Sequence, residues 1–78
     1  MENRLREVMS DVLGVPKEDL DDASSTTTTE NWDSLNHMKL VVALEEEFGV
    51  QFTDEEILQM QDVVSITKVI AKYKNVRT

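Results

Sequence analysis

The chain has 78 residues, of which 40% are hydrophobic, and its 16 acidic and 8 basic side chains give a formal net charge of −8. This length limits it to one domain with a thin core, residues 1–78, and the apolar content exceeds that of a disordered acidic tail. The absence of cysteine excludes a disulfide scaffold, a zinc site with thiolate ligands and a cysteine nucleophile.

The first predicted element is an amphipathic helix over residues 2–13, and Gly14 is a typical C-terminal stop. The apolar residues that recur at helical spacing in it are Leu5, Val8, Met9 and Val12. Residues 16–20 predict a short helical turn that starts near a proline. Residues 21–31 contain four consecutive threonines and one small apolar residue, so we expect a long mobile loop without structure of its own.

A second helix is predicted from Leu35 to Phe48, and Gly49 is its expected C-terminal stop. Its core face consists of Leu40, Val41, Leu44 and Phe48, with His37 among them. Nearly opposite lies a second apolar stripe, formed by Leu35, Met38 and Val42. In so small a bundle such a stripe favours an exposed binding surface, bordered by Lys39, Glu45 and Glu46. The alternative is that the stripe packs beneath the loop or against a later helix.

Two further helices complete the chain. Residues 53–56 form a capping-box sequence, so we expect a short helix over about 54–60 with Ile57 and Leu58 facing inward. Ser65 is the predicted N-cap of the last helix, whose stripe is Ile66, Val69, Ile70 and Tyr73. No segment resembles a strand. The expected fold class is all-α, a small four-helix bundle of three main helices and a short third helix, with a long loop between helices one and two.

The charge is concentrated in residues 18–62, which carry thirteen acids and a single base, Lys39. This acidity repels nucleic acid, and it suits either simple solubility or the docking of basic partners. No apolar run reaches the ~20 residues of a transmembrane helix. Because the first residues also lack the apolar region of a signal peptide, we expect a cytoplasmic protein without a membrane span.

The candidate site lies where the second helix starts, at Trp32-Asp33-Ser34-Leu35. Asp33 is a good N-cap, which makes Ser34 the first helical residue. The free N–H groups and the positive dipole end favour phosphate there, so Ser34 suits a phosphodiester. Because no base is arranged around it, we expect no catalytic residue, and no metal site is expected either. The simpler alternative is a serine that only caps the helix.

Asp33-Ser34-Leu35 at a helix start, followed by Val-Val-Ala-Leu-Glu-Glu-Glu-Phe-Gly over 41–49, resembles the acyl carrier proteins along nearly the whole chain. The resemblance implies a monomeric, non-enzymatic carrier with 4′-phosphopantetheine on Ser34, flanked by Asp33 and Leu35. It implies that a phosphopantetheinyl transferase attaches this arm from coenzyme A and that acyl groups ride on its thiol. Acyl-transferring and ketosynthase-type enzymes with basic patches would dock on Leu35, Met38, Lys39, Val42, Glu45 and Glu46.

The sequence also departs from the members that serve fatty-acid synthesis. Asn36 and Lys39 stand where those members usually have acids, and residues 24–29 lack a bulky apolar residue. We therefore expect a specialised carrier for a polyketide, lipid or polysaccharide-modifying pathway. Three alternatives stay open: a peptidyl or aminoacyl carrier, an unmodified acidic helical adaptor, and a calcium-binding helical protein that would use Asp19, Asp21 and Glu30.

Overall fold

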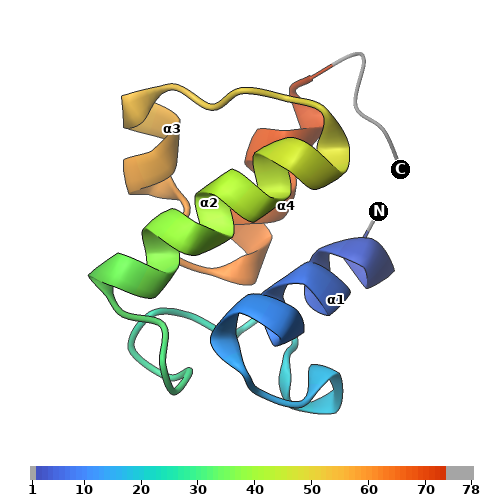
Figure 1. Cartoon of the computed structure of the whole chain (residues 1–78), viewed down its shortest axis with the longest axis vertical. Coiled ribbons are helices and arrows are strands. Elements are labelled where there is room, and N and C mark those ends of the chain that lie inside the picture. Colours follow the sequence, from blue (N-terminus) through green and yellow to red (C-terminus); the bar gives the residue numbers. More distant parts are fainter. Residues whose placement is uncertain (1, 74–78) are drawn as a thin grey trace.

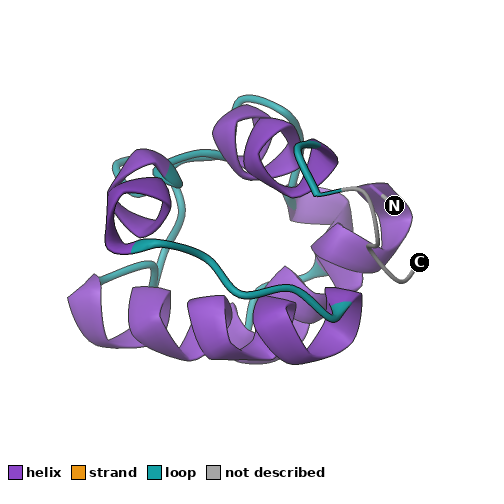
Figure 2. Cartoon of the chain, turned by 90° about the horizontal axis from the view of Figure 1, so that it is seen from above, coloured by secondary structure: helices purple, strands orange, loops and turns teal. Residues whose placement is uncertain are grey.

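The computed structural model describes residues 2–73 of the chain. Its elements are α1 (Glu2–Leu13), the 3-10 turn η1 (Lys17–Asp19), α2 (Ser34–Phe48), α3 (Asp54–Gln59) and α4 (Val63–Ala71). Figure 2 shows helices joined by loops, and the described residues contain no strand. The predicted all-α bundle, with a short third helix and a long α1–α2 loop, is confirmed. Across residues 2–73, no helix combines the length and apolar character that a membrane crossing requires.

One apolar face of each main helix builds the core. In Figure 1, α2 crosses the front of the molecule, α1 lies below it and α4 lies behind it. The largest fully buried side chains are Leu5, Met9, Leu13, Leu40, Leu44, Phe48, Met60, Val63, Ile66 and Ile70. All of them except Met60, which follows the end of α3, lie three or four positions apart on one face of α1, α2 or α4. The glycines that follow α1 and α2, Gly14 and Gly49, adopt φ values of 69° and 67°, the left-handed conformation that ends a helix.

Local capping defines where α3 and α4 begin. The Thr53 hydroxyl accepts from the Glu56 amide at 3.1 Å, and the Glu56 carboxylate accepts from the Thr53 amide at 2.9 Å, which confirms the capping box. The prediction that Ser65 caps α4 was wrong. Asp62 is the N-cap, because its carboxylate accepts from the Ser65 amide at 2.7 Å and α4 begins at Val63.

The inward orientation predicted for α3 holds for one of its two apolar residues. Ile57 is half-buried and packs against the core, whereas the Leu58 side chain is 73% exposed, so the prediction for Leu58 was wrong. Adjacent residues on a helix point about 100° apart, and a helix of six residues presents only one narrow face to the core. The packing of α3, rather than the apolar character of both residues, decides which one is covered.

The α1–α2 loop is bonded to a distant segment. Ser25 and Asp62 form an isolated antiparallel bridge. The Thr26 amide donates to the Gln61 carbonyl at 3.0 Å, and the Val63 amide donates to the Ser24 carbonyl at 3.0 Å. The prediction that this loop lacks structure of its own was therefore wrong in part. Its pairing partner is the α3–α4 connector, which lies too far along the sequence for a local pattern to indicate it.

Tyr73, two residues beyond α4, connects this end of the bundle to α3. Its hydroxyl donates to the Glu56 carboxylate and also lies 2.9 Å from the Gln51 carbonyl oxygen. Its ring meets Phe52 edge to face, with the ring centroids 5.8 Å apart. The hydrogen bond to Glu56 raises the pKa of Tyr73 to about 12, and the same bond lowers the pKa of the Glu56 carboxyl.

The hydrogen bond between Tyr73 and Glu56 makes the free energy of unfolding depend on pH in the alkaline range. Because the folded state favours neutral Tyr73, its contribution is complete below the ordinary pKa of 10.0 and is lost as the pH rises towards about 12. We expect Tyr73→Phe to be less stable than the wild type at pH 8, and the difference to shrink between pH 10 and 12. Urea denaturation at a series of pH values measures this, and a difference that stays constant up to pH 12 would contradict the assigned bond.

Candidate functional site

Ser34 is the first residue of α2 and is exposed. Asp33 precedes it in an extended conformation, and its carboxylate accepts from the Asn36 amide at 2.9 Å, which confirms Asp33 as the N-cap. Within residues 2–73 the Ser34 hydroxyl makes no hydrogen bond. The cap is therefore supplied by Asp33 alone, and the Ser34 hydroxyl is available to a molecule that approaches from outside.

Trp32 and His37 connect the start of α2 to α3. The Trp32 side chain is buried, and its Nε1 donates to His37 Nδ1 at 3.0 Å. His37 Nε2 lies 3.0 Å from the Ile57 carbonyl oxygen. Because Nδ1 accepts a hydrogen bond from the indole N–H, we assign the tautomer in which Nε2 carries the hydrogen and donates to the Ile57 carbonyl. Both ring nitrogens are engaged, so His37 does not serve as a base for Ser34.

Two asparagines join the end of α1 to the start of α2. Asn31 has a φ of 67°, and its side-chain amide donates to the Leu13 carbonyl at 3.1 Å. The Asn36 side-chain amide donates to the Asn31 carbonyl at 2.7 Å. The sequence pattern identified Asn36 only as the loss of an acid, but a carboxylate could not donate this bond. The signal available in the sequence was Asn31 itself, since asparagine is enriched among residues with positive φ.

The positive φ of Asn31 predicts how substitutions at this position change the free energy of unfolding. We expect Asn31→Ala to lower the free energy of unfolding by about 2 kcal/mol, because it removes a hydrogen bond and forces a side chain with a Cβ into the left-handed region. Asn31→Gly is the matched control. It removes the same bond, but glycine adopts this φ without strain, so its loss should be about 1 kcal/mol. Urea denaturation compares the two, and equal losses would show that the positive φ is not retained.

The second stripe of α2 faces outward, as predicted. Leu35, Met38 and Val42 are 67%, 50% and 51% exposed. Of the polar neighbours expected beside the stripe, Lys39 and Glu46 are exposed. Glu45 is half-buried, and its carboxylate accepts from the Phe52 amide at 2.9 Å. Glu45 therefore also fixes the α2–α3 connector, a role that the sequence pattern did not indicate.

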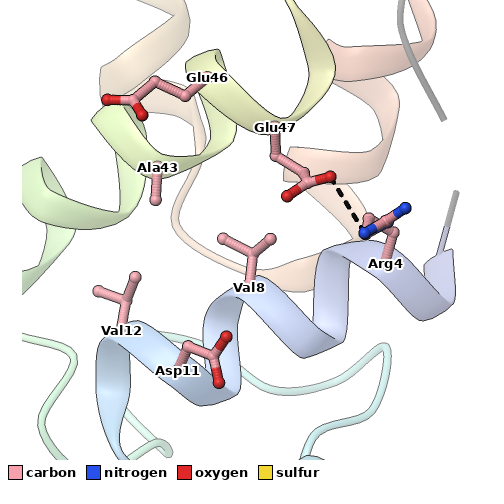
Figure 3. A pocket seen from close by; sticks show the side chains of 7 residues that line it. All are labelled: Arg4, Val8, Asp11, Val12, Ala43, Glu46 and Glu47. Atoms are coloured by element: carbon pink, nitrogen blue, oxygen red, sulfur yellow. Dashed lines mark ion pairs between the residues drawn. The ribbon is translucent and has the colours of Figure 1, made fainter.

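A groove of about 590 Å³ runs between α1 and α2, away from Ser34. Figure 3 shows the Arg4 guanidinium reaching across it to the Glu47 carboxylate, and the two groups are 3.3 Å apart. The apolar side chains of Val8, Val12 and Ala43 also line the groove. Its acidic side chains are Asp11, Glu46 and Glu47. The groove marks the contact between the two helices and includes only one residue of the predicted site, Glu46.

Asp19, Asp21 and Glu30, the residues of the calcium-binding alternative, do not form a set of metal ligands in the structure. Within residues 2–73, no group of three or more His, Cys, Asp or Glu side chains could hold a metal ion. Asp21 instead stabilises a turn, since its carboxylate accepts from the Ala23 amide at 2.9 Å and its own amide donates to the Ser24 hydroxyl at 3.0 Å. The Asp21 carboxylate thus acts as a local turn acceptor, and the Asp22 carboxylate pairs with the Arg6 guanidinium of α1 at 3.1 Å.

Comparison with known proteins identifies relatives along most of the chain. A family model described as "Phosphopantetheine attachment site" matches residues 3–70. An acyl carrier protein of Buchnera aphidicola subsp. Baizongia pistaciae is 33% identical over 73 residues, which cover 94% of this chain and 94% of the relative. An acyl carrier protein of Acidothermus cellulolyticus is 36% identical over 67 residues, which cover 86% of this chain and 80% of the relative.

Proposed function

We infer that Ser34 bears a 4′-phosphopantetheine group, because the chain belongs to the family of phosphopantetheine-carrying acyl carrier proteins. The observation that carries this inference is the exposed, unbonded hydroxyl of Ser34 at the first position of α2. The first amides of a helix and its positive dipole end favour a phosphodiester at this position. We propose that residues 1–78 act as a single carrier domain.

The residues around Ser34 fit such a group. Asp33 occupies the N-cap with its own carboxylate, so the Ser34 side chain is not needed to hold the helix. When bound, the group supplies a terminal thiol, a function that the cysteine-free chain lacks and on which acyl groups are held as thioesters. The protein itself is non-catalytic, as its family is. In the loading reaction the Ser34 oxygen would form the new bond to phosphorus, the P–O bond within the pyrophosphate of coenzyme A would break, and adenosine 3′,5′-bisphosphate would leave. The proton of the hydroxyl would pass to a base that the transferase supplies.

We propose that partner enzymes dock on the exposed stripe Leu35, Met38 and Val42. The observed exposure of all three side chains supports this role. Leu58 of α3 is also exposed, and the hydrogen bond from His37 to the Ile57 carbonyl holds α3 beside the start of α2. Basic patches on acyl-transferring and ketosynthase-type enzymes would be steered by the acids of residues 18–62, while Lys39 selects against partners that require an acid there.

We propose an acyl rather than an aminoacyl cargo, and a specialised pathway such as that of a polyketide, a modified lipid or a modified polysaccharide. The names of both relatives, acyl carrier protein, support the acyl cargo. The specialised role is supported by Asn36 and Lys39. Asn36 stands in place of an acid, and its side-chain amide donates a hydrogen bond to the Asn31 carbonyl. Lys39 is exposed beside the stripe. Location in the cytoplasm and a monomeric state stay predictions from the sequence.

Intact-mass spectrometry tests the proposal directly. The protein is incubated with coenzyme A and a phosphopantetheinyl transferase, and we expect the mass to rise by one phosphopantetheine group per chain. Peptide mapping then locates the group, which should lie on the peptide that contains Ser34. A chain that gains no mass, under conditions in which a known carrier is loaded, would support the unmodified adaptor instead.

A further inference from the structure

The C-terminal part of the chain has a charge opposite in sign to that of its middle. Residues 63–78 carry four bases and no acid, whereas residues 18–62 carry thirteen acids and a single base. A pocket of about 390 Å³ opens between the end of α3 and α4, and its lining residues are Gln59, Ser65, Lys68, Val69 and Lys72. The last four recur at helical spacing and therefore share one side of α4 and its C-cap. We call Ser65, Lys68 and Lys72 the α4 lysine face.

The two lysines of this face are exposed and have no bonding partner. Within residues 2–73 the Lys68 and Lys72 ammonium groups form neither a hydrogen bond nor an ion pair. The hydrogen bond from Tyr73 is the main cause of the lowered pKa of Glu56, and the charge of Lys72 lowers it further. That carboxylate already accepts from the Tyr73 hydroxyl and the Thr53 amide. Both positive charges therefore remain to attract an anion from outside.

Two polar donors accompany the lysines in this pocket. Within residues 2–73 the side chains of Ser65 and Gln59 make no hydrogen bond, so a hydroxyl and an amide group can donate to a carboxylate. The Val69 side chain is almost completely buried. The accessible lining therefore consists of these donors and of the lysines with their aliphatic stems. A carboxylate on a short aliphatic side chain, such as that of glutamate, matches this lining.

The spacing of the lysines and the charge around them select a short acidic segment. Lys68 and Lys72 stand four positions apart, which places their Cβ atoms about 5–6 Å from each other. Two acids one turn apart on a helix of a partner have the same spacing. A long polyanion, such as nucleic acid or an anionic membrane surface, would extend past this face and meet the acids of a chain whose net charge is −8. A short acidic segment avoids that repulsion because it contacts only the side that bears the lysines.

We propose that the α4 lysine face binds an acidic segment of a partner protein, in which two carboxylates one helical turn apart face Lys68 and Lys72. The opposite charge distinguishes this surface from the stripe of α2, where partners with basic patches are proposed to dock. The two surfaces share no residue, so an acidic segment can hold the carrier while a basic enzyme acts at α2. The inference goes beyond the proposed function and does not require the arm on Ser34.

Chemical-shift mapping by nuclear magnetic resonance on the unloaded chain tests this binding. The probe is a helical peptide rich in alanine and glutamine that carries two glutamates four positions apart, and the control peptide has glutamine in their place. We expect the glutamate peptide to shift the backbone amide signals of Ser65, Lys68, Val69 and Lys72 at low salt, and these shifts to shrink at high salt because ions screen the charges. No shift at these residues, or an equal effect of the control peptide, would overturn the proposal.

Variants that remove the positive charges locate the binding on the lysines. Lys68→Gln combined with Lys72→Gln should weaken binding of the glutamate peptide about tenfold, and Lys68→Gln alone about threefold. Both positions are exposed and glutamine is a good helix former, so these variants should fold. Lys17→Gln is the matched control, because it makes the same change in η1, outside the pocket, and should leave the affinity unchanged. Unchanged affinity in the double variant, or an equal loss in Lys17→Gln and Lys68→Gln, would contradict the proposal.

Two further outcomes would assign the α4 lysine face to a different occupant and would also overturn the proposal. Shifts of the same amides that grow with protein concentration, without a response to the glutamate peptide, would indicate a second copy of the chain. Shifts caused by vesicles that contain phosphatidylglycerol, but not by the peptide, would indicate an anionic membrane surface. Loading of Ser34 does not enter these measurements, so a chain that gains no mass with the transferase would overturn the proposed function alone.

Discussion

Ser34→Ala will abolish attachment of the phosphopantetheine group and leave the fold intact. The substitution removes the oxygen that would form the phosphodiester, so loading should fall to the detection limit of intact-mass spectrometry. Asp33 continues to cap α2, because its bond to the Asn36 amide does not involve Ser34. The side chain is exposed and alanine is a good helix former, so the free energy of unfolding should change by less than about 0.5 kcal/mol.

Ser65→Ala is the matched control for this experiment. Ser65 lies in the first turn of α4, where its amide, and not its hydroxyl, bonds to the Asp62 cap. We expect this variant to be loaded at the wild-type rate. Loading of Ser34→Ala to the wild-type level would show that another residue carries the arm. A loss of loading in both variants would point instead to a change in the fold.

Leu44→Ala will destabilise the bundle more than Asn31→Ala or Ser34→Ala. Leu44 lies on the core face of α2 and is 0% exposed, so removing three carbons leaves a cavity in the bundle. We expect a loss of about 2–5 kcal/mol in the free energy of unfolding. A bundle of this size has a total stability of only about 5–15 kcal/mol, so the variant will be substantially unfolded in mild denaturant.

Leu35→Ala is the same chemical change on the opposite face of the same helix. Leu35 is mostly exposed, so we expect the free energy of unfolding to fall by less than about 1 kcal/mol. Because both variants change leucine to alanine, the comparison separates the effect of burial from that of residue type. Urea denaturation measures both variants. If Leu35→Ala costs as much as Leu44→Ala, the outward stripe must be covered in solution, and its role as a docking surface must be given up.

The sequence by itself determined the features that depend on neighbours within a few residues. The spacing of apolar residues predicted the core face of α2, and the buried Leu40, Leu44 and Phe48 confirm it. Glycine after α1 and α2 predicted where these helices end, and the positive φ values confirm that too. Helix periodicity and capping act within about one turn, so the local sequence contains the information needed to predict them.

The same holds for the arrangement at Ser34. The Asp33 cap and the outward direction of Leu35, Met38 and Val42 follow from positions on one helix, and the structure confirms both. The assignment of the arm to Ser34 and of the stripe to partner enzymes stays a prediction that the proposed experiments test. The sequence pattern thus located the candidate site and its exposed face, whereas it did not indicate what surrounds them.

Only the tertiary structure decided which polar groups meet across the chain. The Trp32–His37–Ile57 bonds and the bridge between Ser25 and Asp62 join segments that are separate in sequence. The exposure of Leu58 was likewise set by how α3 rests on the bundle. These contacts depend on how the helices pack, and one sequence constrains long-range pairing far less than it constrains a helical turn. For that reason the sequence identified the serine and its helix, and the packed bundle determined the contacts that surround them.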